Sequence, residues 1–357
     1  MNASILKRAE KFSDAIGTEC PILLGPMAGA CPVGLSVAVA NGGGMGACGA
    51  LLMQPETIDK WAADFRAETK GPFQLNLWIP DKAPIRDPEL EAELCEFLRG
   101  WGPEVSVDAA NETPPDFGAQ CEALLEISPP VISSIMGLFA PSFVKLMKAA
   151  GIKWFANVTT VAEAMAAQSA GADAVIAKSF EAGGHSGAFH PEDAMRYAVG
   201  GLSLIPAIAD AVNLPIVAAG GIADGRTAAA ALVLGASAVQ IGTGYLRATE
   251  STIAPAWSDA ICNAKPEGTL ITKAYSGRAG RSIATKFAVA MEQTDAPIPA
   301  PYPVQRGLTQ AMRADAAKKN QLDSMQAWAG QSAGMAQAKS ATQITRHIWD
   351  STKDILN

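Results

Sequence analysis

The sequence lacks any cysteine pair spaced as a metal or redox motif. Its six cysteines stand apart from one another, with no CxxC or CxxH arrangement. Such spacing argues against a zinc site or a disulfide framework and predicts free, mostly buried thiols. They are Cys20, Cys31, Cys48, Cys95, Cys121 and Cys262.

Basic runs and long hydrophobic runs are also absent. The chain has 28 Lys and Arg against 35 Asp and Glu, a formal net charge of −7, which argues against a nucleic-acid partner or an anionic membrane surface. The most apolar stretch, residues 227–246, is broken by Gly, Ser, Gln and Thr, so we interpret it as a buried helix followed by a strand and not as a membrane span. The charged N-terminus has no apolar core of a signal peptide, and this acidity is typical of a cytoplasmic protein.

Short apolar runs alternate with alanine-rich helical segments from residue 21 to about residue 265. Strands buried on both faces and joined by crossover helices form a parallel sheet. Eight such units predict an α/β fold of the (β/α)8 TIM-barrel type, with an open doubly wound sheet as the alternative. The expected strands are 21–27, 45–50, 73–78, 129–135, 153–158, 173–179, 215–221 and 238–244, and the expected helices are 33–41, 55–69, 141–150, 160–170, 201–212 and 224–235.

Two regions depart from this alternation. Residues 80–128 form a Pro-, Asp- and Glu-rich excursion between the third and fourth strands. After residue 250 the alternation stops, and we expect 251–357 to be a mainly helical segment that caps the barrel mouth. Within this segment we expect helices at 252–263 and 308–328 and an extended proline-rich linker at 295–305. Residues 330–343 are small and polar, and we expect them to be less ordered. The predicted organisation is therefore a barrel over 1–250 and a cap over 251–357.

A GxGxxG pattern at Gly44, Gly46 and Gly49 raises the question of a dinucleotide fold. In that fold the pattern follows a strand and opens a helix. Here it follows a helix and runs into a strand, so we interpret it as a tight turn and exclude a Rossmann domain.

A second glycine-rich region is more specific. Gly220 and Gly221 follow the seventh expected strand, and the eighth ends in "QIGTG", which contains Gly242 and Thr243. Loops after these two strands bind phosphate in many (β/α)8 proteins, through backbone N–H groups and a helix N-terminus. The sequence predicts a phosphate site here, and the alternative is that the glycines only turn the chain tightly.

Asn76 lies near the carboxyl end of the third expected strand, and Met27 lies at the carboxyl end of the first. A buried Asn amide needs a hydrogen-bond partner. A flat heteroaromatic ring with donors and acceptors on its edge would supply one, and neighbouring backbone is the alternative.

The stretch "SFEAGGHSGAFHP", residues 179–191, follows the sixth expected strand, so Lys178 and His185 lie at the catalytic face of the barrel. Its histidines and carboxylates are too widely spread for a metal site, and we expect none. "GHSGA" also lacks the last glycine of a serine-nucleophile elbow. Two interpretations remain: a structural histidine, or a neutral His185 above a bound cofactor that is free to act as general base.

"AYSGRAGRSIATKF", residues 274–287, places Arg278 and Arg281 among glycines after the barrel. An anion-contacting loop and an ordinary solvated basic loop are equally consistent with this pattern.

Together these motifs resemble the nitronate monooxygenase family, formerly called 2-nitropropane dioxygenases. The resemblance rests on "PILLGPMAG", "ANGGGMG", "FQLNLW", "SFEAGGHSG", "PIVAAGGIADGR", "LGASAVQIGT", "SGR" and "PYP". It implies a (β/α)8 enzyme with FMN, His185 as catalytic base, and a substrate site at Ser276, Arg278 and Tyr302. The implied FMN contacts are Met27, Asn76, Lys178, Gly183, Gly220, Gly221, Gln240, Gly242 and Thr243.

The implied reaction is oxidation of a nitronate such as propionate 3-nitronate, or of a nitroalkane, by O2 to a carbonyl compound and nitrite through a flavin semiquinone. An NAD(P)H-dependent FMN reductase of the enoyl-acyl-carrier-protein or quinone type is the alternative, because the same motifs occur in that wider superfamily. Two departures stand out: Lys178 replaces a common Gln, and "SGRAGRS" differs from the usual "SGRxARG". The expected partners are the small-molecule substrate and O2, and a homodimer is left open.

Overall fold

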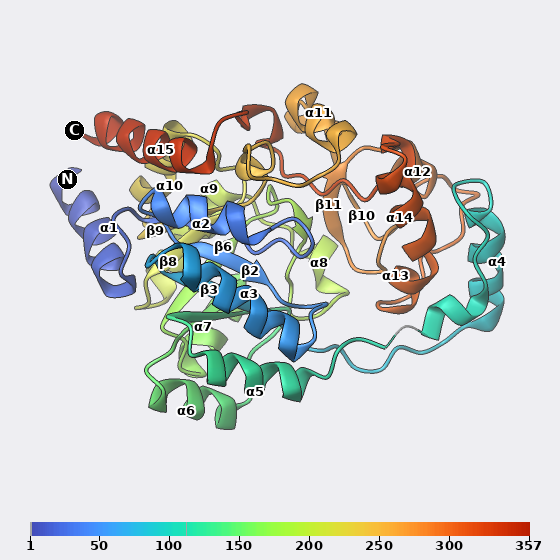
Figure 1. Ribbon diagram of the computed structural model, residues 1–357, viewed down its shortest axis with the longest axis horizontal. Coiled ribbons are helices and arrows are strands. Elements are labelled where there is room, and N and C mark those ends of the chain that lie inside the picture. The colour runs from blue at the N-terminus through green and yellow to red at the C-terminus, as the bar shows by residue number, and fades with distance from the viewer. Residues whose placement is uncertain (1, 112) are drawn as a thin grey trace.

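The computed structural model describes residues 2–111 and 113–357 and contains an eight-stranded parallel sheet closed into a barrel (Figure 1). The strand order is β1-β9-β8-β6-β5-β4-β3-β2, and a parallel bridge between Leu23 and Met45 joins the two ends. The strands are β1 Ile22–Leu24, β2 Gly46–Gly49, β3 Phe73–Trp78, β4 Val131–Ile135, β5 Lys153–Val158, β6 Ala174–Lys178, β8 Ile216–Ala219 and β9 Ala238–Ile241. All eight expected strands are confirmed, and the open sheet is excluded.

Helices follow the strands and cover the outside of the barrel, as the alternation predicts. They are α2 Val33–Asn41, α3 Pro55–Glu68, α5 Phe117–Ile127, α6 Pro141–Ala149, α7 Val161–Ser169, α9 Gly201–Ala211 and α10 Gly225–Val233. The crossover from β3 to β4 is completed by α5, which lies inside the excursion at 80–128. The helix α1 (Asn2–Ile16) contributes Phe12 and Ile16 to the core inside the barrel.

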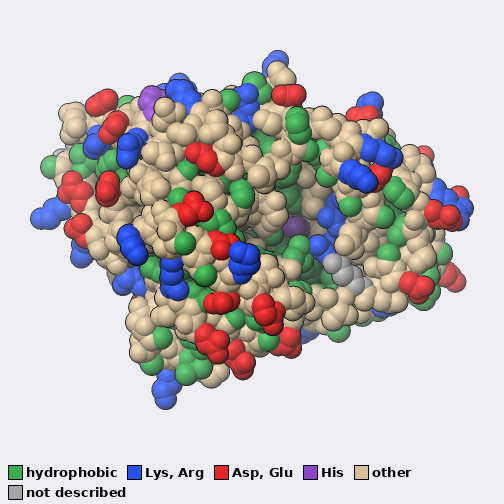
Figure 2. Space-filling view, viewed as in Figure 1, with side chains coloured by type: hydrophobic (Ala, Val, Ile, Leu, Met, Phe, Trp, Pro, Cys, Tyr) green, Lys and Arg blue, Asp and Glu red, His purple; other side chains and the backbone are tan. Residues whose placement is uncertain are grey.

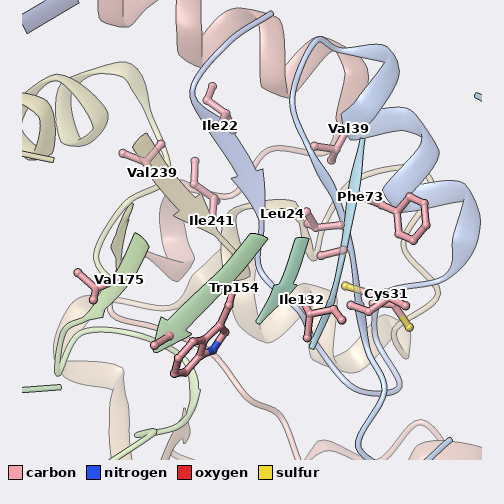
Figure 3. Packing of buried hydrophobic residues seen from close by; sticks show 14 of the residues in the cluster. Ile22, Leu24, Cys31, Val39, Phe73, Ile132, Trp154, Val175, Val239 and Ile241 are labelled. Atoms are coloured by element: carbon pink, nitrogen blue, oxygen red, sulfur yellow. The ribbon is translucent and has the colours of Figure 1, made fainter. Parts of the chain in front are cut away.

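Side chains alternate between two cores along each strand. Leu23 of β1 and Phe155 of β5 belong to the core inside the barrel. Their neighbours Leu24 and Trp154, both labelled in Figure 3, belong to the main core under the helices. This is the period of two that a strand imposes. Near the carboxyl ends of the strands, polar side chains such as Asn76 replace apolar ones inside the barrel. The cavity described below opens at that end.

The C-terminal helix α15 (Ala341–Leu356) differs from the expected organisation. It packs between α10 and α2 and so lies in the helical shell of the barrel rather than over its mouth (Figure 1). A Cβ on Gly225 would lie 2.4 Å from Ser351 Cβ, so the glycine permits this close packing. The buried Thr345 also hydrogen-bonds Tyr245 Oη at 2.7 Å. The stretch expected to be less ordered, residues 330–343, contains a 3-10 turn at Ala333–Met335, and its last three residues begin the 16-residue α15, which has a capping box.

The cap is built from two separate parts of the chain. Residues 251–335 supply α11 Pro255–Asn263, β10 Thr269–Thr272, β11 Gly280–Ile283, α12 Lys286–Ala290, α13 Val304–Leu308 and α14 Gln310–Lys318, and the excursion supplies α4 Pro88–Leu98. Leu94 and Leu98 of α4 share a buried cluster with Tyr275 and Phe287. In Figure 1, α4, α12, α13 and α14 lie together at the right of the barrel.

A three-stranded antiparallel sheet in the cap was not predicted. It has the order β10-β11-β7, where β7 is only Gly184–His185. The helix expected at 308–328 ends at Lys318. Within the described residues, no helix is long and apolar enough to span a membrane, and the six cysteines are free, four of them buried.

Candidate active site

A cavity of about 420 Å³ lies at the carboxyl ends of the barrel strands, between the barrel and the cap. The face shown in Figure 2 is hollowed, with histidine and Lys or Arg atoms inside the hollow. Nearly every residue expected at the site lines this cavity. They are Met27, Asn76, Lys178, Gly183, His185, Gly220, Gly221, Gln240, Gly242, Thr243, Ser276 and Tyr302.

The glycine loops form one wall of the cavity. Gly220 has φ +108°, and a Cβ there would lie 2.3 Å from Ser179 Oγ. A Cβ on Gly183 would lie 2.6 Å from the Gly330 nitrogen, which itself donates to Thr243 Oγ1 at 3.0 Å. Bare backbone therefore borders the cavity beside the N-terminus of α10, an arrangement suited to a phosphate group.

Two buried amides at the floor of the cavity have fixed orientations. Gln74 Nε2 donates to Gln240 Oε1 at 3.0 Å, which leaves the Gln240 nitrogen to donate into the cavity. Asn76 Nδ2 donates to Ser133 Oγ at 2.9 Å and to the Ser133 carbonyl at 3.2 Å, which leaves Asn76 Oδ1 as an acceptor. The floor thus offers a donor and an acceptor to a polar ring edge.

Lys178 ends β6 and brings a positive charge to the same floor. Its Nζ donates to the Gly183 carbonyl at 3.2 Å, and no carboxylate in the described residues forms an ion pair with it. Burial lowers the pKa of the Lys178 ammonium to about 8. A buried ammonium without an acidic partner is stabilised when a ligand brings negative charge to it.

His185 lies on β7, where its pairing with Gly280 of β11 aims it at the cavity. Its ring is held by Trp78, with ring centroids 4.7 Å apart at 84°, and by Trp328 at 5.0 Å. Its Nε2 lies 2.7 Å from Ser276 Oγ. Burial, and then the positive charges of Arg278, Lys178, Arg306 and Arg313, lower the pKa of His185 to about 3. The imidazole is therefore neutral across the physiological range.

The "SGR" and "PYP" motifs meet in space. Gly277 has φ +85°, and a Cβ there would lie 2.3 Å from the Ala300 carbonyl oxygen, so only glycine fits against this loop. The contact places Ser276 opposite His185 and Tyr302 beside Trp78, with ring centroids 5.3 Å apart.

Neither arginine of residues 274–287 belongs to a solvated loop. Arg278 is 3% exposed, lies outside the cavity lining, and pairs with Asp81 at 3.4 Å. Arg281 is 4% exposed, stacks on Phe180 at 4.4 Å and donates to its carbonyl. The interpretation of this segment as an ordinary basic surface loop is wrong, and Arg278 reaches the site only through its charge.

Sequence reasoning missed the part of the cavity formed by the cap. Arg306 of α13 and Arg313 of α14 line it, together with Trp78, Gln326 and Trp328. Arg313 is tied in place by bonds to the Gln326 side chain at 2.9 Å and the Arg306 carbonyl at 2.8 Å. Arg306 follows Tyr302 by four residues. This spacing does not by itself predict that Arg306 lines the cavity, because that depends on how the cap lies over the barrel.

The other interpretations of the histidine loop can now be compared with the structure. Among the described residues, no three His, Cys, Asp or Glu side chains gather in a group that could hold a metal. His190 is exposed, away from the cavity lining. The only carboxylate on the cavity wall, within the part of the chain that the structure describes, is Glu181, whose two oxygens share the one N–H of Gly201 at 3.1 and 3.0 Å.

Comparison with known proteins places the chain among oxidoreductases. A sequence model of the nitronate monooxygenase family matches residues 9–350. A probable nitronate monooxygenase of Staphylococcus aureus (strain MSSA476) is 33% identical over 97% of this chain and 98% of its own length, and one of Staphylococcus saprophyticus is 33% identical over 99% and 100%. Among solved structures, nitroalkane oxidase from Streptomyces ansochromogenes has a TM-score of 0.85 at 29% identity, covering 96% and 98% of the two chains, and FabK from Thermotoga maritima has 0.76 at 29%, covering 97% and 96%.

Proposed function

Because the chain belongs to the nitronate monooxygenase family, we propose that it oxidises small alkyl nitronates with O2 to a carbonyl compound and nitrite, using bound FMN. Propionate 3-nitronate represents the class of substrate. The family match shows an oxidoreductase and supports oxidation of nitro compounds; the reaction, the identity of the cofactor and the ionic form of the substrate are the proposed parts. A cytoplasmic location and a homodimer remain predictions from the sequence.

The polar groups that line the cavity complement those of FMN. The isoalloxazine ring of FMN carries carbonyl acceptors and one N–H donor along its pyrimidine edge. Gln240 and Lys178 would donate to the carbonyls, and Asn76 Oδ1 would accept the ring N–H. The phosphate would lie against the bare backbone at Gly220 and Gly242, near the N-terminus of α10.

The charge of the residues that line the cavity is the single observation on which the proposed substrate rests. Among the described residues, three cationic side chains and one carboxylate line the cavity, namely Lys178, Arg306, Arg313 and Glu181. Lys178 forms no ion pair with any carboxylate that the structure describes. A nitronate is an anion, whereas its parent nitroalkane is neutral at the carbon that loses a proton. The cations therefore favour the nitronate in the ground state.

The residues of the chain have distinct tasks in the proposed reaction. When bound, the flavin supplies electron transfer and the reaction with oxygen. The cations attract the nitronate, and Trp78, Trp328 and Tyr302 enclose it and exclude water. His185, neutral and held by Ser276, orients the nitronate oxygens toward the ring face. Because the pKa of His185 is lowered to about 3, its neutral imidazole is a poor base for removing a proton from a neutral nitroalkane.

The experiment is anaerobic mixing of the purified holoenzyme with propionate 3-nitronate, NADH or NADPH, followed by flavin absorbance. Bleaching by the nitronate alone supports the proposal. A colourless protein that releases no FMN on denaturation contradicts the cofactor assignment.

The second candidate is an NAD(P)H-dependent reductase, and the resemblance to FabK favours it: 29% identity and a TM-score of 0.76 over 97% of the chain. It predicts bleaching by NADPH within seconds and none by the nitronate. In that case the cations of the cap would bind a phosphate-bearing substrate in place of the nitronate.

A further inference from the structure

The two ring nitrogens of His185 have different environments. Nε2 lies 2.7 Å from Ser276 Oγ, whereas Nδ1 makes no hydrogen bond with any residue that the structure describes. Trp78 and Trp328 hold the plane of the ring between them. Nδ1 is thus the nitrogen available to a molecule in the cavity, and the proton on the ring decides whether it acts as donor or acceptor.

The hydroxyl of Ser276 decides where that proton lies. This side chain is fully buried. Its hydroxyl has two acceptors within reach, His185 Nε2 at 2.7 Å and the Arg278 carbonyl at 3.3 Å, and its oxygen accepts from the Arg278 N–H at 3.4 Å. Hydroxyl groups that donate to oxygen typically lie about 2.7–2.8 Å from the acceptor, whereas N–H groups that donate to oxygen lie about 2.9–3.0 Å away. The hydroxyl has one proton, and Nε2 at 2.7 Å is a nearer acceptor than the Arg278 carbonyl at 3.3 Å. The short contact therefore fits O–H donation from Ser276 to Nε2, while the Arg278 N–H fills an oxygen lone pair.

From this geometry we infer that Ser276 holds His185 in the neutral tautomer with its proton on Nδ1. His185 then donates a hydrogen bond to an oxygen of the bound nitronate and does not act as a base. This inference rests on the proposed function for its ligand, but the tautomer is a property of the protein itself. Ser276 is accordingly a positioning residue, because it acts through His185.

The surroundings of Ser276 keep the hydroxyl in place. Gly277 is locked against the loop at Ala300, and the ion pair of Arg278 with Asp81 anchors the next residue. The cations around the ring oppose a second proton on it. An anionic ligand that only accepts hydrogen bonds is matched by an Nδ1–H donor, whereas a neutral nitroalkane would need the Nδ1 lone pair to remove its proton.

The test is long-range 1H–15N NMR of the oxidised holoenzyme labelled with [15N]histidine. The chain has three histidines, and loss of one spin system in His185→Asn assigns the signal. The expected spectrum has a protonated, pyrrole-type Nδ1 and an unprotonated, pyridine-type Nε2. The opposite pattern, or two protonated nitrogens near neutral pH, overturns the inference.

Variants at position 276 separate a tautomer effect from a packing effect. Ser276→Ala should abolish the single-tautomer pattern and raise KM for propionate 3-nitronate roughly tenfold with little change in kcat, as loss of one hydrogen bond to a charged group predicts. Ser276→Thr, which keeps the hydroxyl, should restore the wild-type spectrum. Ser282→Ala is the matched control, because Ser282 is also fully buried in the cap but bonds the Ala327 carbonyl.

An unchanged His185 spectrum in Ser276→Ala overturns the role of Ser276. If both variants at 276 fail to fold, the wild-type spectrum still decides the tautomer. A spectrum of the expected type in an enzyme that does not consume nitronates supports the tautomer and contradicts the proposed function, so the two failures are distinguishable.

Discussion

Lys178 Nζ donates a 3.2 Å hydrogen bond to the carbonyl of Gly183, so the lysine at the end of β6 is tied to the turn that leads to His185. The two side chains line one cavity, one at its floor and the other under the cap. One positive charge thus lies where the proposed flavin ring would be, while the imidazole lies where the substrate would be.

Replacing the ammonium of Lys178 should change the flavin potential. Lys178→Met removes a buried positive charge that favours the extra electrons of the reduced flavin, so the two-electron midpoint potential should fall by on the order of 30–60 mV. Spectroelectrochemical titration measures this shift. Lys153→Met is the control, since Lys153 begins β5 at the opposite end of the barrel strands; an equal shift in both variants would rule out the proposed position of Lys178.

The pKa of His185 predicts how stability depends on pH. In the folded chain this pKa is lowered from 6.5 to about 3, chiefly by burial. Below pH 6.5 the unfolded state therefore binds a proton that the folded state does not, and the free energy of unfolding should fall as pH drops from 6.5 toward 3. The contribution has a slope of up to about 1.4 kcal/mol per pH unit.

Urea unfolding of wild type and His185→Gln between pH 7 and 4 measures that contribution. The variant should lose less stability than wild type as pH falls. His347→Gln is the control, because His347 is exposed. Parallel pH profiles for wild type and His185→Gln would show that the imidazole is not held neutral.

Gly220→Ala should weaken flavin binding. The new Cβ would lie 2.3 Å from Ser179 Oγ at a backbone φ of +108°, so the loop must move away from the expected phosphate position. We expect the flavin Kd to rise by roughly tenfold or more, measured by ultrafiltration and absorbance. Gly268→Ala is the control, because a Cβ there meets no atom within 4 Å. Unchanged affinity in Gly220→Ala would place the phosphate elsewhere.

The C-terminal helix should contribute to barrel stability. Ile348 of α15 is 1% exposed and belongs to the main core, so Ile348→Ala should cost about 2–4 kcal/mol of unfolding free energy. Ile355 of the same helix is 51% exposed, and Ile355→Ala should change stability by less than about 0.5 kcal/mol. Chemical denaturation of both variants decides whether α15 is part of the barrel.

The barrel could be predicted from the sequence because its signals are local. Each strand is a short apolar run, and several helices end at a glycine or begin at a capping residue such as Asp224. The glycines at 220 and 221 and the amide at Asn76 could be assigned to the mouth for the same reason, since the strand ends fix their level in the barrel.

The cap could not be predicted in the same way. Its sheet pairs the two residues of β7 with a strand about a hundred residues later in the chain, and strands this short have no periodicity of their own. The helix α15 returns to the barrel shell after the whole cap, which no local pattern reveals. Arg306 and Arg313 reach the cavity only through these long-range contacts, so their part in the site required the structure.

The most direct test of the central claim compares ethyl nitronate with its own conjugate acid, the neutral nitroethane, in the same enzyme. Initial rates of nitrite formation at pH 7, measured before the two forms interconvert, give kcat/KM for each. A cationic cavity and a neutral, weakly basic His185 predict that the nitronate is preferred by at least about a hundredfold. Equal values, or a preference for the neutral nitroalkane, would contradict the account and restore His185 as a general base.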